Sequence, residues 1–382
     1  MYKVNRIGIG GFRRLVNIEL ETSPFMVLIG ANGAGKTSFL DAMALLSASA
    51  SGELNTTLSR LGGLSSLLTR GRCDSLSLEI EMKVPGHEPL EYALELSTKG
   101  AGYYISKECM SQSHVGHEAP FKHIESRGDD IRYYDAEKRQ LLRPEWAHNP
   151  LETSLSQVPR MFQQPEELRR MLATATHYHV LDVGGRAPVK TPQQMRPAML
   201  PGPDGGDLVP YLYYLREGDR DRFEAITDTL RAAFPGFEEL GFPPVAAGML
   251  TMTWKDANFD KPMYIHELSE GTLRFLWLAA LLQSPSLSTV TMIDEPEVSL
   301  HPELLNLLAD LMREASKRTQ VIVATHSDRF VRFLEPHEVV VMDVDEDGGA
   351  VATRADEMDL EEWLKEYSLD EIWRMGPLGG RS

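Results

Sequence analysis

The chain has 382 residues, 42% hydrophobic and 25% charged, with no apolar run near the roughly 20 residues of a membrane-spanning helix and no recognisable export signal. Two cysteines, Cys73 and Cys109, favour a reducing compartment over a disulfide framework, so we expect a cytoplasmic protein with no membrane contact. The formal net charge of −17 gives no general attraction to nucleic acid, so DNA binding would need a local basic patch or a partner.

The first 110 residues are predicted to be mostly strands around one helix. Short β-branched runs at 3–9, 15–20 and 26–30 are typical of strands. A helix is expected next, because apolar residues from Phe39 to Leu46 recur at helical spacing. The alternating runs SLSLEIEMKV and LEYALELST, followed by GAGYYISKECM, predict antiparallel strands.

Two further segments follow. Between residues 111 and 250 the periodicity weakens around a Pro- and Gly-rich stretch, and we expect a mostly helical insertion whose last two helices end before Pro235 and Gly236. From residue 251 to 382, predicted helices alternate with the apolar strands TVTMID, QVIVAT and EVVVMDV. This alternation is typical of an α/β layer.

A phosphate-binding loop is predicted directly after the apolar run FMVLI. The segment Gly30-Ala31-Asn32-Gly33-Ala34-Gly35-Lys36-Thr37, followed by Ser38, fits G-x-x-x-x-G-K-[ST]. Glycines allow backbone N–H groups to surround phosphates without Cβ clashes, and the following helix N-terminus favours negative charge. We expect Lys36 to contact the β- and γ-phosphates of ATP and Thr37 to ligate Mg²⁺. A chance match is the alternative, and the flanking strand and helix argue against it.

A pair of carboxylates ends the predicted strand TVTMID. Carboxylates at the carboxyl end of such a strand lie beside the phosphate loop in an open α/β sheet. We expect Asp294 to hold Mg²⁺ and Glu295 to polarise the attacking water. An exposed acidic turn is the alternative, which the upstream loop makes less attractive.

Ser269-Glu270-Gly271 opens the apolar helix TLRFLWLAALL. Ser269 suits an N-cap, and Gly271 permits close approach of a ligand to the backbone. Taken alone, this is an ordinary helix start, and His326 alone is as easily a core histidine. The order of phosphate loop, Ser-x-Gly helix start, Asp-Glu strand end and histidine after QVIVAT is the arrangement of ABC-type ATPases.

These residues resemble the signature motif, Walker B segment and switch histidine of that family. The resemblance implies an α/β P-loop NTPase core of the ABC type, with an antiparallel β lobe and a mostly helical insertion. The core would be split between residues 1–110 and 251–382. In the family, the signature of one subunit contacts the γ-phosphate held by the other. Ser269 and Gly271 are therefore implied to act in trans in a homodimer closed by ATP, with His326 sensing the γ-phosphate.

The segments IGIGGFRRL, DEPEVSLHP and ATHSDRF resemble the RecF/SMC-like branch, including small bacterial AAA family ATPases similar to overcoming-lysogenization-defect proteins but without a TOPRIM nuclease domain. The stretch Glu297–His301 matches the segment that joins the two sites across the dimer. Two features depart from the branch: long heptad arms are missing, and the loop expected to carry the Q-loop glutamine offers only Arg60 and Arg70.

Two functions remain open. The first is an ATP-hydrolysing dimeric switch that controls a separately encoded nuclease or other effector in phage defence. The alternative is a DNA-repair or replication ATPase that binds duplex DNA directly through a scattered basic patch. The residues of that patch are Arg127, Lys138, Arg139, Arg143, Arg160, Arg169 and Arg170. A transporter's nucleotide-binding subunit is disfavoured by the long insert.

Two other patterns imitate metal sites. Asp343, Asp345 and Asp347 precede Gly348-Gly349, which predicts a solvated hairpin turn. His177-x-His179 predicts a strand pair, because the sequence around it offers no spaced cysteine or carboxylate partner.

Overall fold

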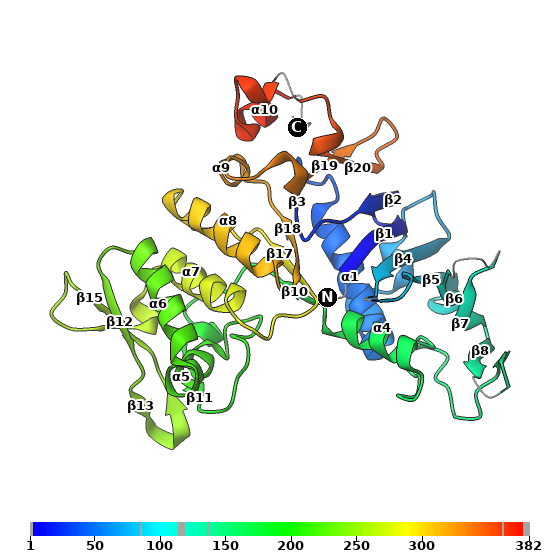
Figure 1. Ribbon diagram of the computed structural model, residues 1–382, viewed down its shortest axis with the longest axis horizontal. Coiled ribbons are helices and arrows are strands. Elements are labelled where there is room, and N and C mark those ends of the chain that lie inside the picture. The colour runs from blue at the N-terminus through cyan, green and yellow to red at the C-terminus, as the bar shows by residue number, and fades with distance from the viewer. Residues whose placement is uncertain (1–2, 85, 114–118, 136–137, 361–362, 377–382) are drawn as a thin grey trace.

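The computed structural model describes residues 3–84, 86–113, 119–135, 138–360 and 363–376. A central parallel sheet lies between an antiparallel β lobe and a second lobe built around α5, α6 and α7 (Figure 1). No helix within these ranges is long and apolar enough to cross a membrane. The mixed α/β architecture with an antiparallel lobe confirms the predicted fold class.

The antiparallel lobe is an eight-stranded sheet in the order β2-β1-β4-β5-β6-β7-β8-β9. Its strands are β1 (Lys3–Phe12), β2 (Leu15–Glu21), β4 (Ser75–Lys83), β5 (Leu90–Lys99), β6 (Gly102–Gln112), β7 (Phe121–Arg127), β8 (Asp130–Asp135) and β9 (Gln140–Leu142). Along β4 and β5, buried residues alternate with more accessible ones, as the period-2 pattern of the sequence predicts. The buried face packs on α1 (Lys36–Ser51) in one hydrophobic core.

The parallel sheet has the order β10-β17-β18-β3-β19-β20, and only β20 runs antiparallel. Its strands are β10 (Thr176–Tyr178), β17 (Val290–Asp294), β18 (Gln320–Ala324), β3 (Phe25–Ile29), β19 (Val339–Val344) and β20 (Ala350–Arg354). Every residue of β3 is buried, as expected for a strand covered on both faces. Met26 and Leu28 enter the core shared with α1, whereas Val27 and Ile29 enter the core on the opposite face.

Helices cover both faces of this sheet. The opposite face and the second lobe share one core, to which α5, α6, α7, α8 and α9 contribute. The helices are α2 (Leu54–Arg60), α3 (Leu64–Leu67), α4 (Gln163–Thr174), α5 (Leu208–Gly218), α6 (Arg220–Ala233), α7 (Glu270–Leu282), α8 (Glu303–Ser316), α9 (Asp328–Val331) and α10 (Leu369–Met375). Two three-stranded sheets complete the second lobe, formed by β12 (Phe237–Gly241), β15 (Thr253–Asp256) and β16 (Met263–Tyr264), and by β11 (Gln193–Gln194), β14 (Met249–Leu250) and β13 (Pro244–Val245).

The segment 111–250 differs from the expected mostly helical insertion. It contains α4, α5 and α6, yet β7, β8 and β9 extend the antiparallel sheet and β10 joins the parallel one. The hairpin between β7 and β8 has a physical cause, because Gly128 (φ 57°) and Asp129 form a two-residue turn closed by the pair Arg127 and Asp130. The chain therefore distributes this segment over three parts of the fold.

Glu108 fastens the segment after β9 to the antiparallel lobe. Its side chain is buried on β6, and its carboxylate accepts hydrogen bonds from the backbone N–H groups of Ser154 (2.6 Å) and Leu155 (2.8 Å). The hydroxyl of Tyr92 donates a third hydrogen bond at 3.0 Å. Burial raises the pKa of Glu108, and the backbone donors oppose that rise.

We predict that Glu108→Ala lowers the free energy of unfolding by about 3 kcal/mol, because three buried donors lose their acceptor. Urea denaturation followed by circular dichroism measures the change. Glu79→Ala, on the exposed face of β4, is the matched control and should stay within about 0.5 kcal/mol of the wild type. Equal stability of the two variants would contradict this role of Glu108.

Candidate nucleotide-binding site

The predicted phosphate loop leaves β3 at the carboxyl edge of the parallel sheet and enters α1. Gly30 has φ 143°, and a Cβ at this position would lie 2.1 Å from the carbonyl oxygen of Met342. Gly35 has φ 111° and immediately precedes Lys36, the first residue of α1. Both positions require glycine, so the loop is a tight turn with the open end of a helix beside it.

Lys36 folds back into this loop. Its ammonium group donates to the carbonyl oxygens of Gly30 (2.7 Å) and Ala31 (3.0 Å), and the residue is buried. Burial lowers the pKa of Lys36, while the charges of Asp294 and Glu295 act in the opposite direction. A buried cation held only by carbonyl dipoles and nearby carboxylates is suited to exchange those contacts for phosphate oxygens.

Asp294 ends β17, the neighbour of β18, and its register partner there is Ala324. Burial raises the pKa of the Asp294 carboxyl and the nearby charge of Glu295 adds to the rise, whereas a hydrogen bond from the Thr37 hydroxyl opposes it. The two predicted Mg²⁺ ligands, Thr37 and Asp294, lie at one cavity. A hydroxyl and a carboxylate are oxygen ligands of the kind that Mg²⁺ prefers, so the donor set fits the predicted ion.

Glu295 turns out of the strand with φ 48°, an unusual conformation for a residue other than glycine. Its backbone N–H donates to the carbonyl oxygen of Ala324 at 2.8 Å, which holds the turn against β18. Its carboxylate oxygen Oε1 lies 3.0 Å from Nδ1 of His326. The predicted catalytic base and the predicted switch histidine are thus direct neighbours.

A cavity of about 570 Å³ lies over the loop. Its walls include Asn32, Gly33, Gly35, Lys36, Thr37, Ser38, Asp294 and Glu295 of the predicted site. Ala34 is buried behind the loop. The sequence analysis did not assign Arg13, Arg14 and Arg72, which also line the cavity, and Arg70 joins them from the loop expected to replace the Q-loop. The adjacent arginines of FRRL, which form the turn between β1 and β2, are the signal that could have indicated Arg13 and Arg14.

The signature helix α7 begins as predicted but outside this cavity. Ser269 is the N-cap and accepts a hydrogen bond from Thr272 N–H at 3.1 Å. A Cβ on Gly271 would lie 2.5 Å from the carbonyl oxygen of Ser299, so this glycine permits close approach of a protein carbonyl within the same chain. Arg274 reinforces the contact by donating to the Ser299 hydroxyl at 2.5 Å. The stretch Glu297–His301 is therefore fixed to the start of α7.

Three predicted site residues lie outside the cavity as lined by the described part of the chain: Ser269, Gly271 and His326. Ser269 is exposed to solvent. Of the predicted site, one chain therefore brings together the phosphate loop and the two carboxylates, and leaves the signature residues available to another molecule. Their contact with nucleotide stays a prediction.

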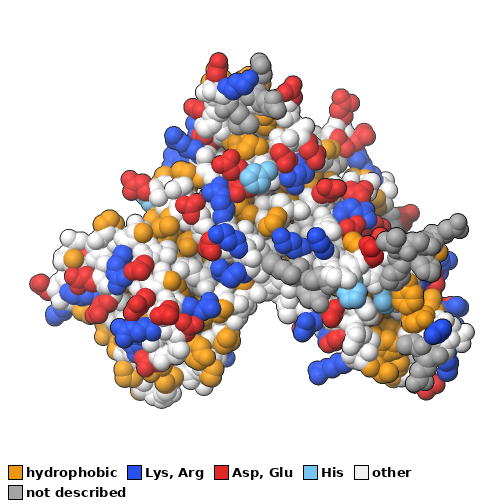
Figure 2. Space-filling view, in the orientation of Figure 1, with side chains coloured by type: hydrophobic (Ala, Val, Ile, Leu, Met, Phe, Trp, Pro, Cys, Tyr) orange, Lys and Arg blue, Asp and Glu red, His pale blue; other side chains and the backbone are white. Residues whose placement is uncertain are grey.

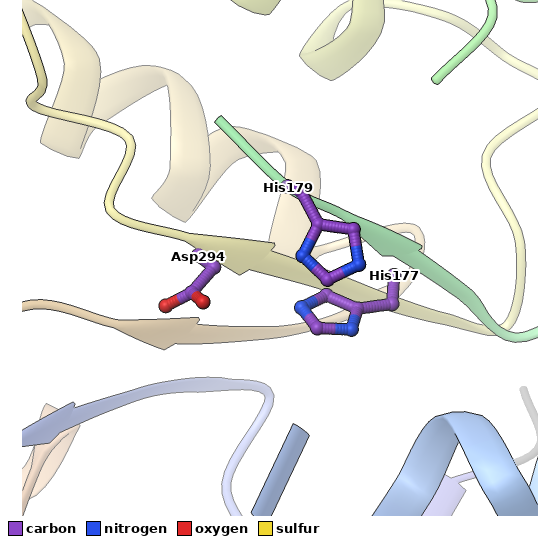
Figure 3. Close-up of side chains that lie close together, drawn as sticks. All are labelled: His177, His179 and Asp294. Atoms are coloured by element: carbon purple, nitrogen blue, oxygen red, sulfur yellow. The ribbon is translucent and has the colours of Figure 1, made fainter. Parts of the chain in front are cut away.

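The histidine pair has a carboxylate neighbour that the sequence analysis missed. His177 lies on β10 as expected of a strand, and β10 pairs with β17, so ligand atoms of His177, His179 and Asp294 lie within 4.8 Å of one another (Figure 3). Burial lowers the pKa of His177 to about 4. No local spacing signals this neighbour, because Asp294 is distant in sequence.

The aspartate run behaves as predicted. The hairpin between β19 and β20 contains Asp345, whose carboxylate accepts a hydrogen bond from the backbone N–H of Gly349 at 2.6 Å. Asp347 and Gly348 lie in the wall of the cavity, where the Asp347 carbonyl accepts a hydrogen bond from Arg72. The run therefore forms a turn beside the phosphate loop.

The fold is that of an ABC-type P-loop ATPase domain, as the sequence resemblance indicated. The family described as "AAA domain, putative AbiEii toxin, Type IV TA system" matches residues 25–332, and the chain belongs to this family. A search of curated proteins found no match.

Solved structures support the fold assignment. The SMC head bound to the C-winged helix domain of ScpA has a TM-score of 0.57 and 15% identity, covering 95% of this chain and 99% of that one. An SMC head domain with an extended coiled coil, bound to the C-terminal domain of ScpA derived from Pyrococcus furiosus, has a TM-score of 0.56 and 13% identity, covering 98% and 100%. Identities this low establish a shared fold alone.

We predict that Gly271→Ala lowers the free energy of unfolding by about 1–3 kcal/mol, because the new methyl group meets the Ser299 carbonyl. The shift of the urea midpoint measures the effect. Gly218→Ala is the matched control, since a Cβ at this exposed end of α5 meets no atom within 4 Å. A Gly271→Ala protein as stable as the control would show that α7 is not held against Ser299.

Proposed function

We propose that the protein binds and hydrolyses ATP as a homodimeric switch, and that the switch controls a separately encoded effector. The observation that carries the proposal is an incomplete site: Lys36, Thr37, Asp294 and Glu295 meet at one cavity, whereas the signature residues lie outside it. A second copy of the chain can supply the missing part.

The cavity suits Mg-ATP. The backbone around Gly30 and Gly35 and the ammonium of Lys36 would hold the phosphates, and Thr37 and Asp294 would hold Mg²⁺. When bound, the ion would offset negative charge on the transferring phosphoryl group. Four arginines at the same cavity add positive charge to its wall: Arg13, Arg14, Arg70 and Arg72. The overall charge of −17 therefore does not prevent anion binding at this point.

Glu295 would orient the attacking water and accept its proton. The left-handed turn after β17 directs this side chain toward the cavity and toward His326. His326 can donate to the carboxylate from Nδ1 and so hold it in place, which makes it a positioning residue as well as the proposed sensor of the γ-phosphate.

Closure of two chains would place Ser269 and Gly271 of one copy against the nucleotide of the other. The stretch Glu297–His301 links the two events, because it follows the carboxylates directly and contacts Gly271 through Ser299. Closure or opening of the dimer at the signature residues would thus change the position of Glu295 through a short, hydrogen-bonded segment.

An effector outside the chain is the second part of the proposal. The family description names a toxin of a type IV toxin–antitoxin system, and both SMC heads are bound to a domain of another protein. The bound SMC heads support a switch that acts on a protein partner, and the role in phage defence rests on the sequence resemblance.

Direct DNA binding is the alternative function. Three arginines of the candidate basic patch contact carboxylates: Arg127 with Glu125 (4.0 Å), Arg143 with Asp130 (3.1 Å) and Arg169 with Glu166 (2.6 Å). On the face shown in Figure 2, basic side chains are interspersed with acidic ones. This pattern gives a nucleic acid backbone little net attraction, so we favour the protein effector.

We predict that ATP hydrolysis per chain rises with chain concentration and falls at least about 100-fold in Glu295→Gln, because the amide cannot accept the proton from water. ATP binding should persist in this variant. Glu303→Gln, whose side chain is 88% exposed at the start of α8, should hydrolyse ATP at the wild-type rate. A steady-state assay across chain concentrations, with and without duplex DNA, measures all three.

A rate per chain that is independent of concentration would contradict the dimeric site. Unchanged hydrolysis in Glu295→Gln would contradict the assignment of the base. Stimulation by duplex DNA would favour the alternative function over the protein effector.

A further inference from the structure

The pairing of β10 with β17 places two imidazoles beside Asp294. His177 is the register partner of Met292 and Tyr178 that of Ile293, and His179 directly follows the end of β10, next to Asp294 at the end of β17. Alternate residues of a strand share one face, and paired residues of neighbouring strands share it too. The sheet itself therefore gathers His177, His179 and Asp294 on one side, while Tyr178 packs against Trp277 on the other.

His177 has a buried ring nitrogen without a hydrogen-bond partner among the described residues. Its side chain is only 5% exposed, and Nδ1 lies 3.8 Å from a carboxylate oxygen of Asp41 on α1. Its other nitrogen, Nε2, is buried and has no hydrogen-bond partner. The Asp41 carboxylate is beyond hydrogen-bond distance, but its negative charge favours a proton on Nδ1 and so a lone pair on Nε2. Buried polar atoms are seldom left unpaired, so the unpaired Nε2 indicates that a ligand binds there.

The three donors can close on one ion. Figure 3 shows the imidazole rings one above the other, on the same side of Asp294. Their ligand atoms lie within 4.8 Å of one another, and tetrahedral coordination at metal–nitrogen distances near 2 Å needs about 3.4 Å between donors. His179 is exposed and free to make this adjustment.

We propose that His177, His179 and Asp294 bind one divalent cation of the imidazole-preferring class, such as Zn²⁺, in the absence of nucleotide. Two imidazoles and one carboxylate are the ligands of such ions, with the fourth position left to water. The site shares Asp294 with the proposed Mg²⁺ site, but its other two ligands are imidazoles and not the Thr37 hydroxyl. It does not depend on ATP binding or on the proposed function.

The test uses the full chain, stripped of metal with EDTA and free of nucleotide. Titration with Co²⁺, followed by its visible absorption, and competition by Zn²⁺ should give one ion per chain. His179→Ala and His177→Ala should each weaken binding at least about tenfold, as expected for the loss of one ligand. His337→Ala, an exposed histidine elsewhere on the surface, should bind as the wild type does.

Thermal denaturation provides a second readout, because an ion that binds only the folded chain raises its melting temperature. Zn²⁺ should raise that temperature for the wild type and for His337→Ala, and should not raise it for His179→Ala. Since His179 is exposed, this variant decides the outcome even if His177→Ala does not fold. Absence of saturable binding by the wild type, or wild-type affinity in His179→Ala, would overturn the proposal.

Discussion

Parallel pairing of β17 with β18, and of β18 with β3, brings the carboxyl ends of three strands to one edge of the sheet. The phosphate loop, the two carboxylates and the predicted switch histidine all start from these ends, so their spacing is set by backbone hydrogen bonds. Hydrophobic cores on both faces hold the sheet, with α1 on one side and α8 on the other. The site residues at these strand ends are therefore held in place before a nucleotide binds and need little reorganisation to contact it.

The carboxyl edge of the parallel sheet also contacts the start of α7, where Ser269 is exposed to solvent. Ser299 follows the carboxylates by a few residues and contacts Gly271 so closely that only glycine fits. The start of α7 is therefore packed directly against the segment that follows the strand-end carboxylates. If a second chain binds at the exposed Ser269, as we propose, this contact would connect the signature to Glu295. This is a physical basis for coupling between subunit closure and hydrolysis.

The sequence pattern predicted those elements whose formation depends on residues adjacent in the chain. Alternation predicted β4 and β5, and the glycine-rich loop with its Lys36 predicted the start of α1, because each depends on residues adjacent in sequence. Features that depend on strand order were harder to predict. The proximity of His177 to Asp294 requires knowing that β10 pairs with β17. The distribution of residues 111–250 over three parts of the fold likewise depends on long-range pairing, which periodicity within that segment does not reveal.

The central claim is that an active site is shared between two chains, and mixing two inactive variants tests it most directly. Lys36→Ala removes the phosphate contact and Ser269→Arg blocks the signature, so each protein alone should be inactive. A mixed dimer keeps one intact site, built from the loop of one chain and the signature of the other. We predict recovery of up to about a quarter of the wild-type rate, since half of the dimers are mixed and each has one of two sites. No recovery in a mixture that forms dimers would contradict the shared site.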